Sequence, residues 1–272
     1  MPCLKNAPIA GSIQISKTLD SASQTLFGSV NFKYPKNNLK DMKEANTQLN
    51  NTITFLKKKK KVLFLTTSNR WAGDKDKPKS TLLAEKIAKK LGKNKVKIID
   101  IAKLKIYPCE GNVSTSKGNR CGLPDAKLKD KRKNPSGNHC CWASINNKDD
   151  ELWRVSKELF ESDCVLFFGS VRWGQTNSIY QKLIERLTWI ENKHSTLKEK
   201  NIVKNITAGI ILVGQNWHGQ EVVNTETEVL KFFGFKVAKE LCWNWQYTNN
   251  SNDETQESYQ KAFPIFSKMF LK

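Results

Sequence analysis

The sequence becomes apolar at Lys61-Val62-Leu63-Phe64-Leu65-Thr66-Thr67 and polar again directly afterwards, at Ser68-Asn69-Arg70. Two later stretches repeat this change: Cys164-Val165-Leu166-Phe167-Phe168-Gly169 before Ser170-Val171-Arg172-Trp173-Gly174, and Ala208-Gly209-Ile210-Ile211-Leu212-Val213 before Gly214-Gln215-Asn216-Trp217-His218-Gly219. Short, continuous apolar runs are typical of strands that are buried on both faces of a parallel sheet. Because such sheets bind ligands at the carboxyl ends of their strands, we predict that the three loops form one binding site.

Segments of strand and helix character alternate around these runs. We predict strands over 61–67, 95–101, 164–169, 207–213 and 236–245, and helices over 80–91, 149–162, 177–192, 220–234 and 254–270. The helical segments carry apolar stripes at helical spacing, such as Leu83, Ile87 and Leu91. Strands that alternate with helices pair in parallel through right-handed crossovers, so the expected fold class is α/β, a doubly wound three-layer sandwich.

The chain divides into an extension and one domain. Residues 1–56 are rich in Asn, Lys, Ser and Thr, and their apolar residues are isolated. Such a segment cannot bury enough surface to fold alone, so we predict an N-terminal extension that is poorly ordered or wraps the core. The domain covers 57–272 and includes an excursion over 102–148. Since this excursion is longer than an ordinary connection, we expect it to be functional or flexible.

The formal net charge of +20 raises the possibility of a nucleic-acid partner. The basic residues are mostly lysines scattered along the chain, however, with one cluster at 57–61. This distribution argues against a nucleic-acid site and favours anionic ligands in general. No apolar stretch is long enough to cross a membrane, and the first residues do not resemble a secretory signal. We therefore expect a soluble, cytoplasmic protein without a membrane partner.

The cysteines form no compact pattern. Four of the seven, Cys109, Cys121, Cys140 and Cys141, lie in the excursion, separated by 11 and 18 residues and then directly adjacent. Zinc sites favour cysteine pairs about two to four residues apart, and iron–sulfur ligands are also closely spaced. We therefore predict no metal site and keep an iron–sulfur cluster as an alternative.

The first loop has the residues of a phosphate site. Ser68 and Arg70 follow the strand, and Ser80 and Thr81 begin an amphipathic helix. Free N–H groups, hydroxyls and the positive end of the helix dipole would meet there. The alternative interpretation is ordinary capping of the helix by Ser80.

The order of the loops resembles the flavodoxin-like superfamily and, within it, the NAD(P)H-dependent FMN reductases. Thr67-Ser68-Asn69-Arg70 is similar to the family's Gly-Ser-x-Arg, with Thr67 in place of Gly. Ser170-Val171-Arg172-Trp173-Gly174 is similar to its Pro-x-Tyr-Trp/His-Gly loop, with Ser170 in place of Pro, and Glu185-Arg186 to its Asp-Arg. The resemblance covers roughly 61–247 and implies a five-stranded parallel sheet in the order 2-1-3-4-5.

The resemblance also implies the ligand. FMN would be held by its phosphate at the first loop, while its ring would lie against the other two: Ser170, Val171, Arg172, Trp173, Gly174 and Gln175, and then Gly214, Gln215, Asn216 and Trp217. NADPH or NADH would give hydride to the flavin, and a quinone, flavin or similar small molecule would accept the electrons. The cofactor does this chemistry, so we assign no catalytic side chain.

The resemblance leaves other functions open. A flavodoxin-like electron carrier would bind the same cofactor without its own NAD(P)H site, and an iron–sulfur flavoprotein would carry a cluster in the excursion. Related reductases commonly place the flavin near a subunit interface, so we expect a homo-oligomer.

Overall fold

A computed structural model describes residues 39–70, 76–92, 94–214, 217–246 and 255–271. The chain divides into two compact units, residues 1–34 and 35–272, and the described residues all belong to the second unit. The first 38 residues of the predicted N-terminal extension lie outside the described residues.

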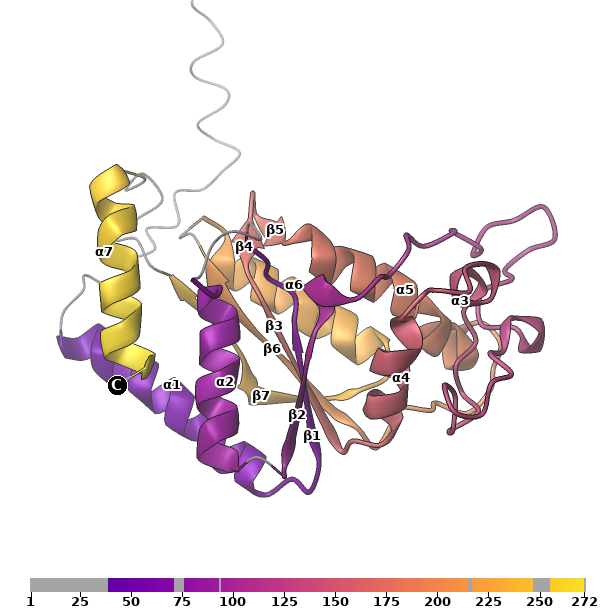
Figure 1. The fold of residues 1–272 in the computed structure, drawn as a ribbon, viewed down its shortest axis with the longest axis horizontal. Helices are drawn as coiled ribbons and strands as arrows, with labels where there is room; N and C mark the ends of the chain where they lie inside the picture. The colour runs from indigo at the N-terminus through magenta and orange to yellow at the C-terminus, as the bar shows by residue number, and fades with distance from the viewer. Residues whose placement is uncertain (1–38, 71–75, 93, 215–216, 247–254, 272) are drawn as a thin grey trace, which may run out of the picture. The chain divides into compact units, whose positions relative to one another are not determined.

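A five-stranded parallel sheet forms the centre of this unit (Figure 1). Its strands lie in the order β2 (Val96–Asp100), β1 (Val62–Thr66), β3 (Cys164–Gly169), β6 (Thr207–Gly214) and β7 (Lys236–Gln246). Since β4 (Val171–Arg172) and β5 (Gln175–Thr176) form a separate antiparallel pair, this is the predicted order 2-1-3-4-5 of the sheet strands. The predicted fold class, a flavodoxin-like α/β sandwich, is confirmed.

Helices cover both faces of the sheet, and each face has its own apolar cluster (Figure 1). One face is covered by α1 (Leu39–Lys57), α2 (Lys79–Leu91), α7 (Gln256–Phe266) and the π-helical turn η3 (Ser267–Leu271), and the other by α4 (Leu152–Phe160), α5 (Ser178–Ser195) and α6 (Gly219–Phe232). Successive strand residues serve opposite faces, as Leu63 and Phe64 do in β1. The predicted strands and helices of 57–272 all occur, with ends shifted by a few residues.

Helix α1 corrects the predicted boundary of the domain. Residues 39–56 are predicted to belong to the extension, whereas the structure has a helix there whose Leu49, Ile53 and Leu56 are buried against the sheet. Thr52 Oγ1 donates to the backbone oxygen of Glu240 at 2.7 Å and accepts from Trp243 Nε1 at 2.9 Å. The helical spacing of Leu49, Ile53 and Leu56 is the sequence signal for this helix. The polar residues between them lower the average hydrophobicity of the segment and make the signal weak.

The excursion is held to the domain by a buried arginine. Arg186 of α5 pairs with both carboxylate oxygens of Asp150, at 2.8 and 3.0 Å. It also donates to the backbone oxygen of Tyr107 at 2.6 Å and to Ser144 Oγ at 2.9 Å. The excursion contains two 3-10 turns, η1 (Ile101–Lys103) and η2 (Pro124–Ala126), and the short helix α3 (Trp142–Asn146). None of the described helices is both long and apolar enough to cross a membrane.

Candidate functional site

The carboxyl ends of β1 and β3 are joined by one buried side chain, that of Asn177. Its Nδ2 donates to the backbone oxygen of Thr67 at 2.9 Å, and its Oδ1 accepts from the backbone N–H of Ser170 and from Thr67 Oγ1, both at 3.1 Å. A Cβ on Gly169 would lie 3.1 Å from that same Oδ1. We call Asn177, Thr67 and Ser170 the strand-end clamp, because together they set the separation of the first two loops. The clamp lies at the point where the strand order reverses, which is where doubly wound sheets bind ligands.

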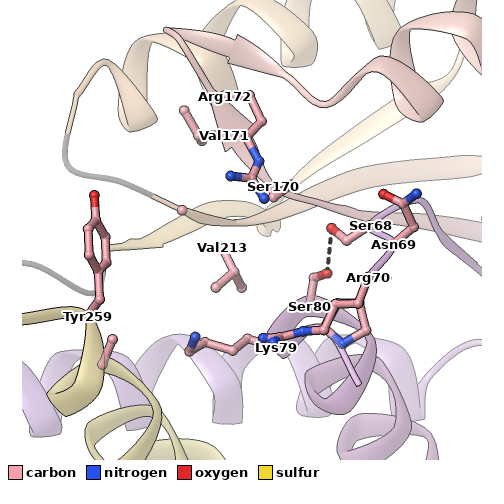
Figure 2. Close-up of a pocket in the computed structure, with 13 residues that line it drawn as sticks. Ser68, Asn69, Arg70, Lys79, Ser80, Ser170, Val171, Arg172, Val213 and Tyr259 are labelled. Atoms are coloured by element: carbon pink, nitrogen blue, oxygen red, sulfur yellow. Dashed lines mark hydrogen bonds between the residues drawn. The ribbon is translucent and has the colours of Figure 1, made fainter. Parts of the chain in front are cut away.

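A cavity of about 410 Å³ opens beside the clamp (Figure 2). Its described lining comes from four parts of the chain: Ser68, Asn69 and Arg70 after β1; Pro78, Lys79 and Ser80 at α2; Ser170, Val171 and Arg172 after β3; and Val213, Gly214, Tyr259 and Ala262 from β6 and α7. Three of these side chains are basic, and none of the described lining residues is acidic. The electrostatics therefore favour an anionic ligand.

The first turn of α2 faces this cavity without a cap of its own. Pro78 precedes the helix and supplies no side-chain hydrogen bond, and the first turn has no acidic residue. Ser80 Oγ instead donates to Ser68 Oγ at 2.9 Å, which holds the helix start against the first loop. The Oγ1 of Thr81 is buried without a hydrogen-bond partner among the described residues. Since the first N–H groups of a helix have no partner within it, this end can receive a phosphate.

The electrostatics of the cavity perturb one lysine. Lys79 is half-buried, and burial together with the nearby charge of Arg70 lowers its pKa below the ordinary lysine value. Two like charges held close together repel each other in the free protein, and a bound anion between them relieves this repulsion.

The second loop is a tight hairpin. Arg172 pairs with Gln175, so Trp173 and Gly174 form a two-residue connection, and both have positive φ, 51° and 67°. These angles are typical of a type I′ turn, which a bulky residue such as Trp173 rarely enters. The Trp173 side chain is 85% exposed.

The third loop packs against this hairpin. A Cβ on Gly214 would lie 2.7 Å from Val171 Cβ, so only glycine allows the end of β6 to approach so closely. A Cβ on Gly174 would lie 3.3 Å from the Trp217 ring, which is 45% exposed and stands edge-on to the His218 ring at 4.5 Å. Each of the two loops therefore presents an exposed aromatic side chain, Trp173 in the second and Trp217 in the third, and neither lines the cavity.

The structure brings together seven of the predicted site residues as cavity lining: Ser68, Arg70, Ser80, Ser170, Val171, Arg172 and Gly214. Trp173, Gly174, Gln175 and Trp217 belong to the second and third loops but do not line it, and neither does Thr81 in the first turn of α2. Gln215 and Asn216 lie outside the described residues. The other six lining residues are not among the predicted site residues: Asn69, Pro78, Lys79, Val213, Tyr259 and Ala262. In the sequence Lys79 is one of several lysines before the helix, and no sequence signal links α7 to the first loop.

The excursion cysteines do not gather into a metal site in the part of the chain that the structure describes. Among those residues, no three His, Cys, Asp or Glu side chains are arranged to hold a metal ion. Burial raises the pKa of the Cys121 thiol to about 12, so this cysteine is protonated at neutral pH. A protonated thiol is a poor metal ligand and a poor nucleophile.

Comparisons with known proteins agree with this architecture. No protein-family model matches the sequence, and no curated protein is significantly similar to it. The solved structure of RosB with a bound 8-demethyl-8-formylriboflavin-5'-phosphate aligns with 78% of this chain and 76% of its own, at 14% identity and a TM-score of 0.51. The azoreductase of Bacillus anthracis aligns with 78% of this chain and 95% of its own, at 15% identity and a TM-score of 0.44. At 14% identity the likeness to RosB concerns the fold alone, which is flavodoxin-like.

Proposed function

We propose that this protein is a flavin-dependent NAD(P)H oxidoreductase that binds FMN at the carboxyl edge of its sheet. The observation that carries the proposal is the cavity, whose described lining combines Arg70, Lys79 and Arg172 with two serine hydroxyls and the start of α2. Cations, hydroxyls and unbonded helix N–H groups are the donors that a phosphate monoester needs.

The phosphate would be held at the first loop. Ser68 and Ser80 are already hydrogen-bonded to each other, so their hydroxyls are oriented before a ligand arrives. Arg70 adds a charged donor from the same side of the cavity. Thr81 Oγ1, buried and without a described partner, offers one more hydroxyl if the helix start adjusts.

The ring would lie along the second and third loops. Gly214 lets two backbones meet closely, and Ser170, Val171 and Arg172 of the second loop line the cavity. Trp173, Gly174 and Gln175 of the hairpin would run beside the flavin ring, and Trp217 would cover it. Gln215 or Asn216 of the third loop would hydrogen-bond the pyrimidine edge of the ring. Bound FMN supplies the chemistry of accepting hydride from NADPH or NADH and passing electrons to a small acceptor such as a quinone or flavin. The chain binds, orients and shields, and requires no side-chain base.

An anaerobic titration tests the proposal. FMN is added to the purified protein while its visible absorption is followed, and NADPH or NADH is then added. We expect a shift of the flavin bands on binding and bleaching by the nucleotide. Arg70→Gln should weaken FMN binding by about tenfold to a hundredfold, the effect of one charge-assisted contact, whereas Lys90→Gln at the other end of α2 should leave it unchanged.

Three other outcomes would contradict the proposal in different ways. Flavin that binds but does not bleach favours the electron carrier, and an added broad brown absorbance favours an iron–sulfur flavoprotein. A protein that ignores FMN altogether overturns the flavin assignment. Light scattering of the loaded protein tests the proposed homo-oligomer in the same preparation.

A further inference from the structure

Arg120 joins three segments of the excursion through its backbone. Its N–H donates to the backbone oxygen of Asn112 at 2.8 Å, and its backbone oxygen accepts from Trp142 Nε1, also at 2.8 Å. Cys121 follows Arg120 directly, and Cys141 directly precedes Trp142. These two thiols are therefore carried by neighbouring segments.

A third thiol belongs to the same group. Cys109 lies shortly before Asn112, and its Sγ accepts from the backbone N–H of Gly111 at 3.5 Å, so its side chain is folded over the turn that leads to Asn112. Burial is the main reason for the raised pKa of Cys121, and the charges of Cys141 and Cys109 raise this pKa further. Such an effect requires that the thiols lie near one another. We call Cys109, Cys121 and Cys141 the thiol cluster.

The members of the thiol cluster differ in access. All three are free thiols, but Cys109 and Cys121 are half-buried, whereas Cys141 is 8% exposed. The Sγ of Cys141 also accepts from Arg186 Nη2 at 3.4 Å, so this residue belongs to the buried network that anchors the excursion. A dissolved reagent can therefore reach Cys109 and Cys121 more easily than Cys141.

The chain between the two accessible thiols has no regular structure to break. Residues 109–121, all of which the structure describes, contain no helix or sheet strand, and one isolated bridge, between Thr115 and Gly118, closes a turn among them. Small changes in backbone angles can therefore bring the two sulfur atoms into bonding distance.

We propose that Cys109 and Cys121 form a site of oxidative modification, at which a small disulfide such as oxidised glutathione converts the two thiols into an intramolecular disulfide. The Cys109 thiolate attacks the reagent, forms a mixed disulfide and releases one glutathione thiol. Cys121 then attacks the Cys109 sulfur and releases the second. The two cysteines lose two electrons and two protons, and the disulfide of the reagent is reduced to two thiols. Neither cysteine lines the cavity, so this inference does not rest on the proposed function.

The environment of Cys121 determines the order of the two steps. With its pKa raised to about 12, this thiol is protonated at neutral pH and is a poor first nucleophile. It reacts second, when the mixed disulfide at Cys109 is held beside it and the attack is intramolecular. Cys109 is therefore the residue that meets the reagent.

The experiment exposes the reduced, folded full chain to oxidised glutathione. Free thiols are counted before and after, and peptides are mapped by mass spectrometry without reduction. We expect the loss of two of the seven thiols and a linked pair of peptides that carry Cys109 and Cys121, since trypsin can cleave between them at Lys117 and Arg120.

Three variants separate the roles of the cysteines. Cys109→Ser should form no disulfide, and Cys121→Ser should stop at the mixed disulfide with glutathione on Cys109. The matched control is Cys242→Ser, which removes a half-buried thiol of β7 outside the thiol cluster and should form the disulfide as the wild type does. Circular dichroism of each variant checks that the fold is retained.

Other results would overturn the inference. Retention of all thiols would do so, as would a disulfide between any other pair of cysteines, or a disulfide that forms only after the protein is unfolded in urea. A Cys121→Ser protein that takes up no glutathione at Cys109 would overturn the assigned order of attack.

Discussion

At the site, Thr67 and Ser170 both donate a hydrogen bond to the side chain of Asn177. The family loops that this chain resembles have Gly where Thr67 stands and Pro where Ser170 stands. A glycine has no hydroxyl and a proline has no N–H, so neither could make the bonds that both residues give to Asn177 Oδ1. The two departures from the family pattern are therefore parts of one buried network.

We predict that Asn177→Ala lowers the free energy of unfolding by about 2–3 kcal/mol, because it leaves the buried Thr67 oxygen and Ser170 N–H without their partner. Ligand affinity should fall as well, since the first two loops lose their fixed separation. Urea unfolding and a binding titration measure the two effects. Asn224→Ala, at an exposed position in α6, is the matched control and should change neither. A fully stable Asn177→Ala protein would contradict the role of the clamp.

Trp173 has a strained, positive φ and an exposed side chain. Because neither feature stabilises the fold, our hypothesis is that its side chain contacts a ligand. Asparagine is preferred where Trp173 stands in a type I′ turn. We predict that Trp173→Asn raises the free energy of unfolding by about 1 kcal/mol while weakening flavin binding. Thermal unfolding and an FMN titration test both halves. If flavin affinity is unchanged, Trp173 does not cover the ring.

At the scale of elements, the excursion depends on buried polar contacts more than on regular structure. Besides the Arg186–Asp150 pair, His139 Nδ1 lies 2.7 Å from Ser156 Oγ of α4, and its ring lies 5.3 Å from that of Trp189 in α5. Burial lowers the pKa of His139 from 6.5 to about 4, against a smaller raising effect of Asp150 and with a further lowering effect of Arg186. The imidazole is therefore neutral in the folded protein at pH 6.

This change in pKa predicts a loss of stability in acid. Between pH 6.5 and about 4, His139 binds a proton in the unfolded chain but not in the folded protein. Stability contributed by this residue should fall by about 3 kcal/mol as the pH drops through that window. Urea unfolding at several pH values, compared between the wild type and His139→Gln, isolates the effect. Parallel curves for the two proteins would refute it.

At the scale of the whole domain, α1 completes the second apolar face of the sheet. Leu56 is fully buried in the cluster that also holds Trp243 of β7 and Phe270 of η3, so the two ends of the described chain meet over the same strand. Helix α1 is consequently part of the core and not an appendage to it.

We predict that Leu56→Ala lowers the free energy of unfolding by about 2–4 kcal/mol, the usual cost of a cavity in a packed core. Asn51→Ala, exposed on the same helix, should stay within about 0.5 kcal/mol of the wild type. Chemical denaturation compares the three proteins. Equal stability of Leu56→Ala and Asn51→Ala would mean that α1 does not contribute to the core.

The strands and helices of 57–272 could be predicted because their signals are local. The run 62–65 is apolar throughout and is followed by three hydroxyl residues, and Leu83 and Ile87 lie at helical spacing. Apolar character and period therefore identify each element without knowledge of its neighbours. The order of strands and helices along the chain also predicts that the three loops lie together, because the carboxyl ends of parallel strands meet at one edge of the sheet.

Three features depended on contacts between residues far apart in the chain. Leu49, Ile53 and Leu56 are core residues only because β7 lies against them, and Tyr259 reaches the cavity only because η3, which follows α7, packs against α2. Asn177 joins Thr67 across 110 positions of the chain. Such contacts leave no periodic trace, since a sequence pattern records which side of an element is buried and not which partner buries it.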